Sequence, residues 1–479
     1  MNFATIRRRC GRLASAAAVL FLLVGAGCQR PSPDVQIVVV RPGQAPLTAP
    51  TLASTAAAPQ LTPTPAPLSA PLSAPTASLS ATATPFYQGP LSPACGQRLP
   101  LLPAPSGPLV DTLSPDAGAL AHLQSILPDA ARPALRRILA APETVGLAVY
   151  RAGEEDSGVY LNPDVPMPLA SVVKVIHLVA YAEAAAAGRL DPLRPVQLAD
   201  LDAYYLPRSD LGAQARALRE LEDEGRILAE LEQVRLEDVP WMMIRYSSNA
   251  ATDYLHLMLG QATLEETASL LGLTSQTAPC PFLGQFLAMA NHTRSGNDRG
   301  AVDAYLADPV AYGREAMLLT DAYRSSAAFR DDEAAWRGLF RRPALDTQRY
   351  FSHALNPQAS ARDYANLMAR IAQNGLSNGE SSFIARRYLE WPMRFPANQE
   401  IFSNLGYKNG SLPGILTTLY YAYPKGEVTP VVVALFFRDL PLPTYREWRD
   451  SLSHDELARW LMADPQAIPA LRAVLNSDF

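Results

Sequence analysis

The chain has three lysines among its 479 residues, and two of them stand beside residues that could take part in acyl transfer. Lys174 closes the segment Ser171-Val172-Val173-Lys174, and Lys408 opens the segment Lys408-Asn409-Gly410. Residues three apart are neighbours on one face of a helix, so Lys174 would reach the hydroxyl of Ser171. A serine attacks a carbonyl only after a base takes its proton. The spacing therefore predicts a serine nucleophile with a lysine base.

The residues around Lys174 favour its burial. Between Ala170 and Ala182, nearly all the residues apart from Lys174 are apolar. Burial disfavours the charged amine and lowers the pKa of a lysine, which is what a lysine base requires. The alternative is a surface lysine on an amphipathic helix, with no role in chemistry.

The segment Ser247-Ser248-Asn249 lies between the two lysines. The Ser247 hydroxyl could relay a proton to a leaving nitrogen, and the Asn249 amide could hold an acyl substituent. The alternative is a turn that caps a helix, because serine and asparagine are good N-caps.

The segment around Lys408 precedes a stretch rich in β-branched and aromatic residues. A cation on an edge strand can bind a substrate carboxylate, and Gly410 would let the substrate approach the backbone closely. The alternative is an ordinary turn built on Asn409-Gly410.

Taken together, these segments resemble those of the serine β-lactamase and penicillin-binding protein superfamily, and those of class A β-lactamases most closely. Its members carry Ser-x-x-Lys, then Ser-Asp-Asn, then Lys-Thr-Gly. The resemblance covers roughly residues 121–479. It implies that the backbone N–H groups of Ser171 and Ser411 form an oxyanion hole. It also implies these roles: Ser171 as the acylated nucleophile, Lys174 as its base, Ser247 as the proton relay, Asn249 as a contact for the ligand amide, and Lys408, Asn409, Gly410 and Ser411 as the substrate-binding strand, with Lys408 and Ser411 anchoring the carboxylate.

The chain departs from that pattern in three ways. Ser248 replaces the usual Asp and Asn409 the usual Thr, and both keep hydrogen-bonding capacity. The Glu-x-x-Leu-Asn loop, whose Glu activates the deacylating water in class A enzymes, is missing, and Asp346 is only a weak substitute. Without a general base an acyl-enzyme would form and persist.

Three functions are compatible with these departures. The first is a serine hydrolase that acts on a β-lactam or a related acyl-D-amino-acid amide. The second is a D-alanyl-D-alanine peptidase, penicillin-binding protein or esterase on the same scaffold. The third is a catalytically silent module that binds the cell wall.

The order of elements predicts the α+β class. Strands are expected at 145–150 and 157–161, and again at 415–423 and 428–438 around a turn at 424–427. Helical patterns fill most of residues 200–388 and return at 445–475. We expect an antiparallel sheet built from both chain ends and flanked by helices, with an inserted all-helical subdomain, as in β-lactamases and D,D-peptidases.

The N-terminus predicts export. Residues 1–27 combine arginines, a short apolar run and small residues before Cys28, which resembles a lipoprotein signal with lipid on Cys28. Plain cleavage or a retained anchor are the alternatives. Residues 28–107 are rich in Pro, Ala, Ser and Thr and predict a disordered tether. Residues 108–479 would form the hydrolase domain, held outside the cytoplasm at a membrane.

The remaining composition narrows the partners. A net charge of −5 argues against a nucleic-acid binder. The six histidines form no metal-spaced cluster, and there is no glycine loop for phosphates, so we expect no cofactor. We expect a monomer. Cys95 and Cys280 either pair in a disulfide, as leftover cysteines of exported proteins do, or remain two separate thiols.

Overall fold

The computed structural model describes residues 95–101, 107–228, 230–294, 299–339, 341 and 343–475. All of them belong to one compact unit. The predicted signal (1–27), the lipid site Cys28 and most of the predicted tether lie outside the described residues.

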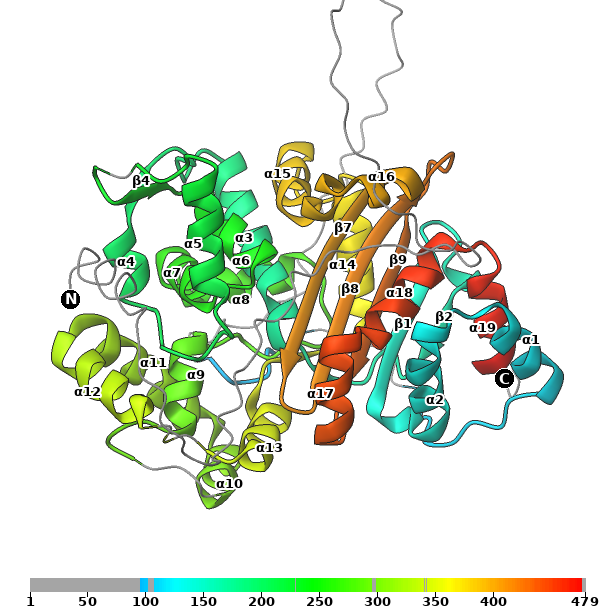
Figure 1. Cartoon of the computed structure of the whole chain (residues 1–479), viewed down its shortest axis with the longest axis horizontal. Coiled ribbons are helices and arrows are strands. Elements are labelled where there is room, and N and C mark those ends of the chain that lie inside the picture. Colours follow the sequence, from blue (N-terminus) through cyan, green and yellow to red (C-terminus); the bar gives the residue numbers. More distant parts are fainter. Residues whose placement is uncertain are drawn as a thin grey trace, which may run out of the picture. The chain divides into compact units, whose positions relative to one another are not determined.

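A five-stranded antiparallel sheet joins the two ends of the domain (Figure 1). Its order is β2-β1-β9-β8-β7, so the strand from early in the sequence pairs directly with the last one. The outer strand β7 is an edge. The bounds are β1 Val145–Arg151, β2 Val159–Leu161, β7 Phe402–Leu412, β8 Ile415–Pro424 and β9 Val431–Phe437.

Helices cover both faces of this sheet. Every residue of β9 is buried, which explains its unbroken Val-Val-Val-Ala-Leu-Phe-Phe sequence. One face packs against the apolar side of α14. Ser360 is the N-cap of this helix, and its side chain accepts a hydrogen bond from Asp363 N. The opposite face packs against the C-terminal helices α17, α18 and α19, and the first helices α1 and α2 pack in turn against α19 and α18. These bounds are α1 Ala117–Ile126, α2 Arg132–Ala140, α14 Ala361–Ala372, α17 Leu442–Ser451, α18 Ser453–Ala463 and α19 Ala467–Leu475.

A block of helices lies between β2 and β6 in the sequence, and it gathers beyond the β7 edge in Figure 1. The predicted α+β architecture with a helical insertion is therefore confirmed. Two small ladders connect this part of the chain, β3 with β6 and β4 with β5. Helix α15 (Gly379–Leu389) and helix α16 (Pro396–Ile401) lead back to the sheet.

The elements of this block are the 3₁₀ turn η5 and the following helices and short strands. Their bounds are β3 Met167–Pro168, η5 Ala170–Val173, α3 Lys174–Ala186, β4 Pro195–Gln197, α4 Leu198–Asp202, α5 Ala213–Asp223, β5 Gln233–Arg235, α6 Asp238–Arg245, α7 Asn249–Leu259, α8 Gln261–Leu270, α9 Phe282–Met289, α10 Arg299–Ala307, α11 Pro309–Ser325, α12 Ala327–Gly338, α13 Leu345–Leu355 and β6 Gln358–Ala359.

Residues 95–101 belong to the fold, although the sequence analysis placed them in the tether. Gly96 N donates to Ala278 O, and Leu99 N donates to Gln276 O, so this segment forms an isolated antiparallel bridge that pairs Arg98 with Thr277. Cys95 and Cys280 form a disulfide. Gly313 permits the contact with α11, since a Cβ there would lie 1.9 Å from the Cys95 carbonyl oxygen. The Pro-rich composition therefore predicts the end of the tether too late, because residues 95–101 already contact the folded domain.

Candidate active site

Ser171 lies in the turn η5, which is held from two sides. Ala170 N donates to Asn356 Oδ1 at 2.8 Å, and Thr417 Oγ1 donates to Leu169 O at 2.9 Å. Ala170 has a φ of 47°, in the left-handed region that non-glycine residues seldom adopt. Such strain persists only where the surroundings over-determine it, and it is common at functional sites. The Ser171 hydroxyl makes no hydrogen bond to any described residue and so is available to a substrate.

Lys174 is fully buried at the start of α3. Its Nζ donates to Ser247 O at 2.6 Å and to Asn249 Oδ1 at 2.8 Å. Ser247 Oγ lies 3.2 Å from the same nitrogen. The ring of Phe282 covers it, with 4.6 Å between Nζ and the ring centroid. The amine is therefore enclosed by protein groups rather than by water.

Burial lowers the pKa of Lys174 to about 7, although Asp253 and Asp210 act in the opposite direction. Near neutral pH a large fraction of the amine is then uncharged. A neutral amine has two hydrogens, which the Ser247 carbonyl and the Asn249 side chain can accept. Its lone pair remains free to take a proton from a neighbouring hydroxyl. Lys174 thus has the protonation state that a general base needs.

The segment Ser247-Ser248-Asn249 caps a helix and also contacts Lys174. Ser248 is the N-cap of α7: its hydroxyl accepts from Ala251 N at 3.0 Å and donates to Gln214 Oε1 at 2.6 Å. Ser247, with a φ of 64°, and Asn249 instead contact Lys174. The departure from Asp at position 248 therefore affects the cap and leaves the two flanking contacts in place.

Lys408 brings a second buried amine to Ser247. Its Nζ lies 3.2 Å from Ser247 Oγ and donates to Asn409 O at 2.6 Å. Burial lowers the pKa of Lys408 well below its ordinary value, and the nearby Lys174 lowers it further. The Ser247 hydroxyl thus connects the two lysines. Because it has a single hydrogen, it can donate to one amine while accepting from the other.

Gly410 brings strand β7 against the Ser171 turn. A Cβ on Gly410 would lie 2.7 Å from both Ser171 N and Leu169 O, so any larger residue would push the strand away. The next residue, Ser411, hydrogen-bonds Tyr445 OH of α17 at 3.0 Å. The Asn409 side chain makes no hydrogen bond within the described part of the chain. The edge of β7 therefore presents a lysine, a glycine and a hydroxyl pair beside Ser171.

The cover over Lys174 is apolar and firmly held. Asp253 accepts from Phe282 N and Leu283 N, each at 2.7 Å, and so fixes the start of α9. Burial raises the pKa of Asp253 to about 7, although those two backbone donors and Lys174 favour its ionised form. The carboxylate is occupied by the backbone, so the side chain facing Lys174 from this element is an aromatic ring.

Asp346 does not take the place of the missing glutamate. It is exposed in the first turn of α13. The other end of this helix, at Leu355, lies next to Asn356, which contacts the Ser171 turn. At 1.5 Å per residue, Asp346 is roughly 13 Å farther along the helix axis. We therefore assign Asp346 no role in deacylation.

The structure brings together most of the predicted site residues. These residues are Ser171, Lys174, Ser247, Asn249, Lys408, Gly410 and Ser411. Cys95 and Cys280 form a structural link outside this group, and Cys28 lies outside the described residues. Sequence reasoning missed Asp253, Phe282, Asn356 and Tyr445. Of these, Asp253 alone carries a local signal, since it lies four residues after Asn249 on the same helix and so near the same face.

Two further properties concern only the described residues. No group of three His, Cys, Asp or Glu side chains among them is arranged to hold a metal ion. No helix in the same part of the chain has both the length and the hydrophobicity needed to cross a bilayer.

Solved structures that resemble the chain include a β-lactamase from Sphaerobacter thermophilus (17% identity, 72% of this chain and 95% of that chain covered, TM-score 0.42). PBP-A (14%, 72% and 98%, TM-score 0.39) and a β-lactamase from Chitinophaga pinensis (13%, 69% and 98%, TM-score 0.41) are others. No curated protein sequence matches the chain. The sequence model of the β-lactamase enzyme family matches residues 130–439, well over half of the chain, and the protein therefore belongs to that family.

Proposed function

We propose that the protein is an exported serine hydrolase that is acylated at Ser171 by a β-lactam or a related acyl-D-amino-acid amide. One observation carries this proposal: a fully buried lysine, Lys174, one turn after Ser171, with its pKa lowered to about 7. A structural lysine would be solvated or paired with a carboxylate. Lys174 instead contacts a carbonyl, an amide oxygen and a hydroxyl.

In the proposed acylation, neutral Lys174 takes the proton of Ser171 as the serine oxygen attacks the substrate carbonyl. The negative charge that develops on the carbonyl oxygen is stabilised by the backbone N–H groups of Ser171 and Ser411. The C–N bond then breaks, and Ser247 passes a proton to the leaving nitrogen. Its contacts with both lysines supply a route for replacing that proton.

Binding of the substrate carboxylate is assigned to the β7 edge. A carboxylate bound beside Lys408 would favour its charged form against burial and so gain an ammonium partner, and Ser411 with Tyr445 supplies hydroxyl donors. Asn249 would contact the amide of the acyl substituent through its NH₂ group, while its oxygen accepts from Lys174.

Deacylation is proposed to be slow. Phe282 covers Lys174 from the side of α9, and a ring cannot take a proton from water. This observation favours a penicillin-binding protein or D-alanyl-D-alanine peptidase over an efficient β-lactamase. An esterase shares the same acylation step, whereas a silent cell-wall-binding module lacks it.

Mass spectrometry of the intact full-length chain during incubation with benzylpenicillin tests the acylation. We expect an adduct with the mass of the intact penicillin that persists over hours, and no adduct with Ser171→Ala. An adduct that clears rapidly would contradict slow deacylation. Equal labelling of the Ser171→Ala variant would contradict the assigned nucleophile. No adduct from the wild type would favour the silent module.

The pH dependence of acylation tests the base. Since the base must be neutral, the second-order acylation rate should rise about tenfold per pH unit below pH 7 and level off above it, because the pKa of Lys174 lies at about 7. Asp253 titrates in the same range, so Asp253→Asn is the control. Removing its negative charge should move the inflection to lower pH. Complete loss of the inflection in that variant would assign it to Asp253.

The substitution Phe282→Glu tests the role of the aromatic cover. It would place a carboxylate against Lys174, where it could activate water. General-base catalysis contributes about 10² to 10⁴ in rate, so the penicillin adduct should decay at least tenfold faster. Phe282→Gln is the matched control, because it has the same shape as Glu without the charge. Equal decay rates for the Glu and Gln variants would show that the missing base is not what limits turnover.

We also propose that the chain is anchored outside the cytoplasm by lipid on Cys28, with residues up to about 94 as the tether. The arginines, short apolar run and small residues before Cys28 support this proposal. The mature protein isolated from a bacterial host should begin at Cys28 and carry a diacylglyceryl group, detected by mass spectrometry of its N-terminal peptide. In Cys28→Ser the lipid should be lost and the protein released from membranes. An unmodified N-terminus at another residue would contradict the anchor.

A further inference from the structure

A cavity of about 440 Å³ lies beside the isolated bridge between Arg98 and Thr277. Its size is within the range of small-molecule sites. It is separate from the candidate active site, because Lys174, Ser247 and Lys408 do not line it. Of the residues that line it, only Asn356 also contacts the Ser171 turn.

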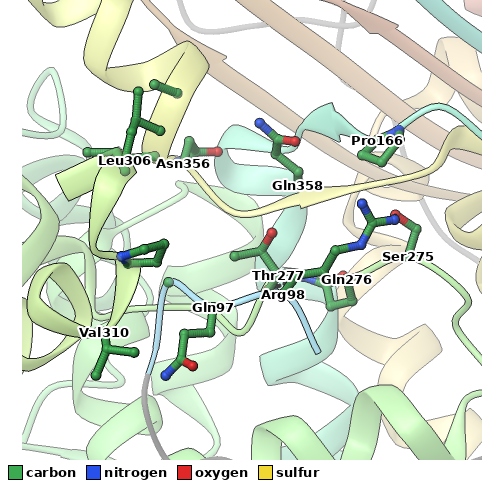
Figure 2. Close-up of a pocket in the computed structure, with 14 residues that line it drawn as sticks. Gln97, Arg98, Pro166, Ser275, Gln276, Thr277, Leu306, Val310, Asn356 and Gln358 are labelled. Carbon is green, nitrogen blue, oxygen red and sulfur yellow. Dashed lines mark hydrogen bonds between the residues drawn. The ribbon is translucent and has the colours of Figure 1, made fainter. Parts of the chain in front are cut away.

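The two sides of the cavity differ in chemistry. Figure 2 shows Arg98, Ser275 and Gln358 on one side and Leu306 and Val310 on the other. Leu306 and Val310 are 42% and 43% exposed, which is high for neighbouring large apolar side chains. A ligand would therefore meet polar groups along one side and an apolar surface along the other.

Arg98 provides the charge on the polar side. It donates to Ser275 Oγ at 3.2 Å and forms no ion pair with any carboxylate in the described part of the chain. A guanidinium has five N–H donors, and its planar fork matches a carboxylate. The side-chain nitrogen of Gln358 donates to His353 O. Its side-chain oxygen can then accept a hydrogen bond from a peptide N–H.

Asn356 connects the cavity to the nucleophile turn. Its Oδ1 accepts from Ala170 N, and its Nδ2 donates to Gln285 Oε1 at 3.5 Å. Gln285 in turn donates to Cys280 O. Cys280 is bonded to Cys95, next to the segment 96–98 that forms another wall of the cavity, and it precedes Phe282 by two residues. A ligand that displaces these walls would therefore act on the Ser171 turn through Asn356 and on the segment that leads to Phe282 through Cys280.

We propose that this cavity binds an N-acyl amino acid or short peptide with a free carboxylate and an apolar side chain, and that Asn356 transmits its occupancy to the Ser171 turn. The carboxylate pairs with Arg98, the peptide N–H donates to Gln358, and the apolar side chain packs on Leu306 and Val310. The coupling to Ser171 rests on the proposed function, whereas the binding does not.

Binding is tested by a saturation-transfer NMR titration of the full-length chain with N-acetyl-leucine. N-acetyl-leucinamide, which lacks the carboxylate, is the matched ligand. We expect millimolar affinity for the acid and at least fivefold weaker binding of the amide. Arg98→Gln should weaken binding of the acid at least fivefold, and Arg136→Gln, an exposed arginine on α2, should leave it unchanged.

Lys408→Gln separates the cavity from the candidate active site, which also carries a cation. Binding should survive this substitution. Loss of binding in Lys408→Gln but not in Arg98→Gln would overturn the proposal, as would equal binding of acid and amide or no binding at all.

Coupling is tested by the dependence of the rate of penicillin adduct formation on the concentration of N-acetyl-leucine. At saturation the rate should change at least twofold in the wild type, and the same change in Arg98→Gln should need at least fivefold more ligand. A constant rate in both proteins would overturn the coupling. If the wild type forms no adduct even without the ligand, the proposed function fails, and the titration still decides whether the cavity binds carboxylates.

Discussion

The removal of Lys174 from water is the constraint on which the rest of the site depends. Transferring an ammonium group into a protein interior is costly, and proteins usually respond by lowering the pKa so that the group becomes neutral. Here the neutral amine is matched by two acceptors, the Ser247 carbonyl and the Asn249 side chain. The Ser247 carbonyl is aimed at the amine by a left-handed backbone conformation, so part of the folding free energy is used to hold this geometry.

The second buried lysine strengthens the same effect. Two ammonium groups on one hydroxyl would repel each other in a medium of low dielectric constant. At least one of Lys174 and Lys408 is therefore expected to be neutral, and the shared Ser247 hydroxyl lets a proton pass between them. Arginine supplies nearly all other positive charge in the chain, but its guanidinium stays protonated in proteins. This difference explains why lysines stand at these two positions in a chain that otherwise avoids them.

The sequence predicted the sheet, the helical insertion and the segments that meet at Lys174, because each depends on local periodicity or on short spacing. The contacts of Ser247 and Asn249 with Lys174 were not predicted, since the segment was considered either as a helix cap or as a proton relay and ligand contact. In the structure Ser248 caps the helix while its two neighbours contact the lysine. Phe282 and Asn356 could not be found, because each lies about a hundred residues or more from the residue that it contacts, with no motif around it. Cys95 with Cys280 stayed open because the sequence sets no distance between cysteines 185 residues apart.

The apolar cover over Lys174 is held more firmly than a residue that merely fills space would need. Asp253 fixes the backbone at Phe282 and Leu283 by accepting one short hydrogen bond from each N–H. Gly284 lets α9 approach α11 closely, because a Cβ there would lie 2.1 Å from Ala316 O. The disulfide at Cys280 joins the same segment to residues 95–101. With its backbone held at three points and its ring buried, Phe282 cannot readily move away to admit water beside Lys174. The inserted helices and the N-terminal segment are therefore best understood as supports for this cover, which links the additions to the fold with the proposed persistence of the acyl-enzyme.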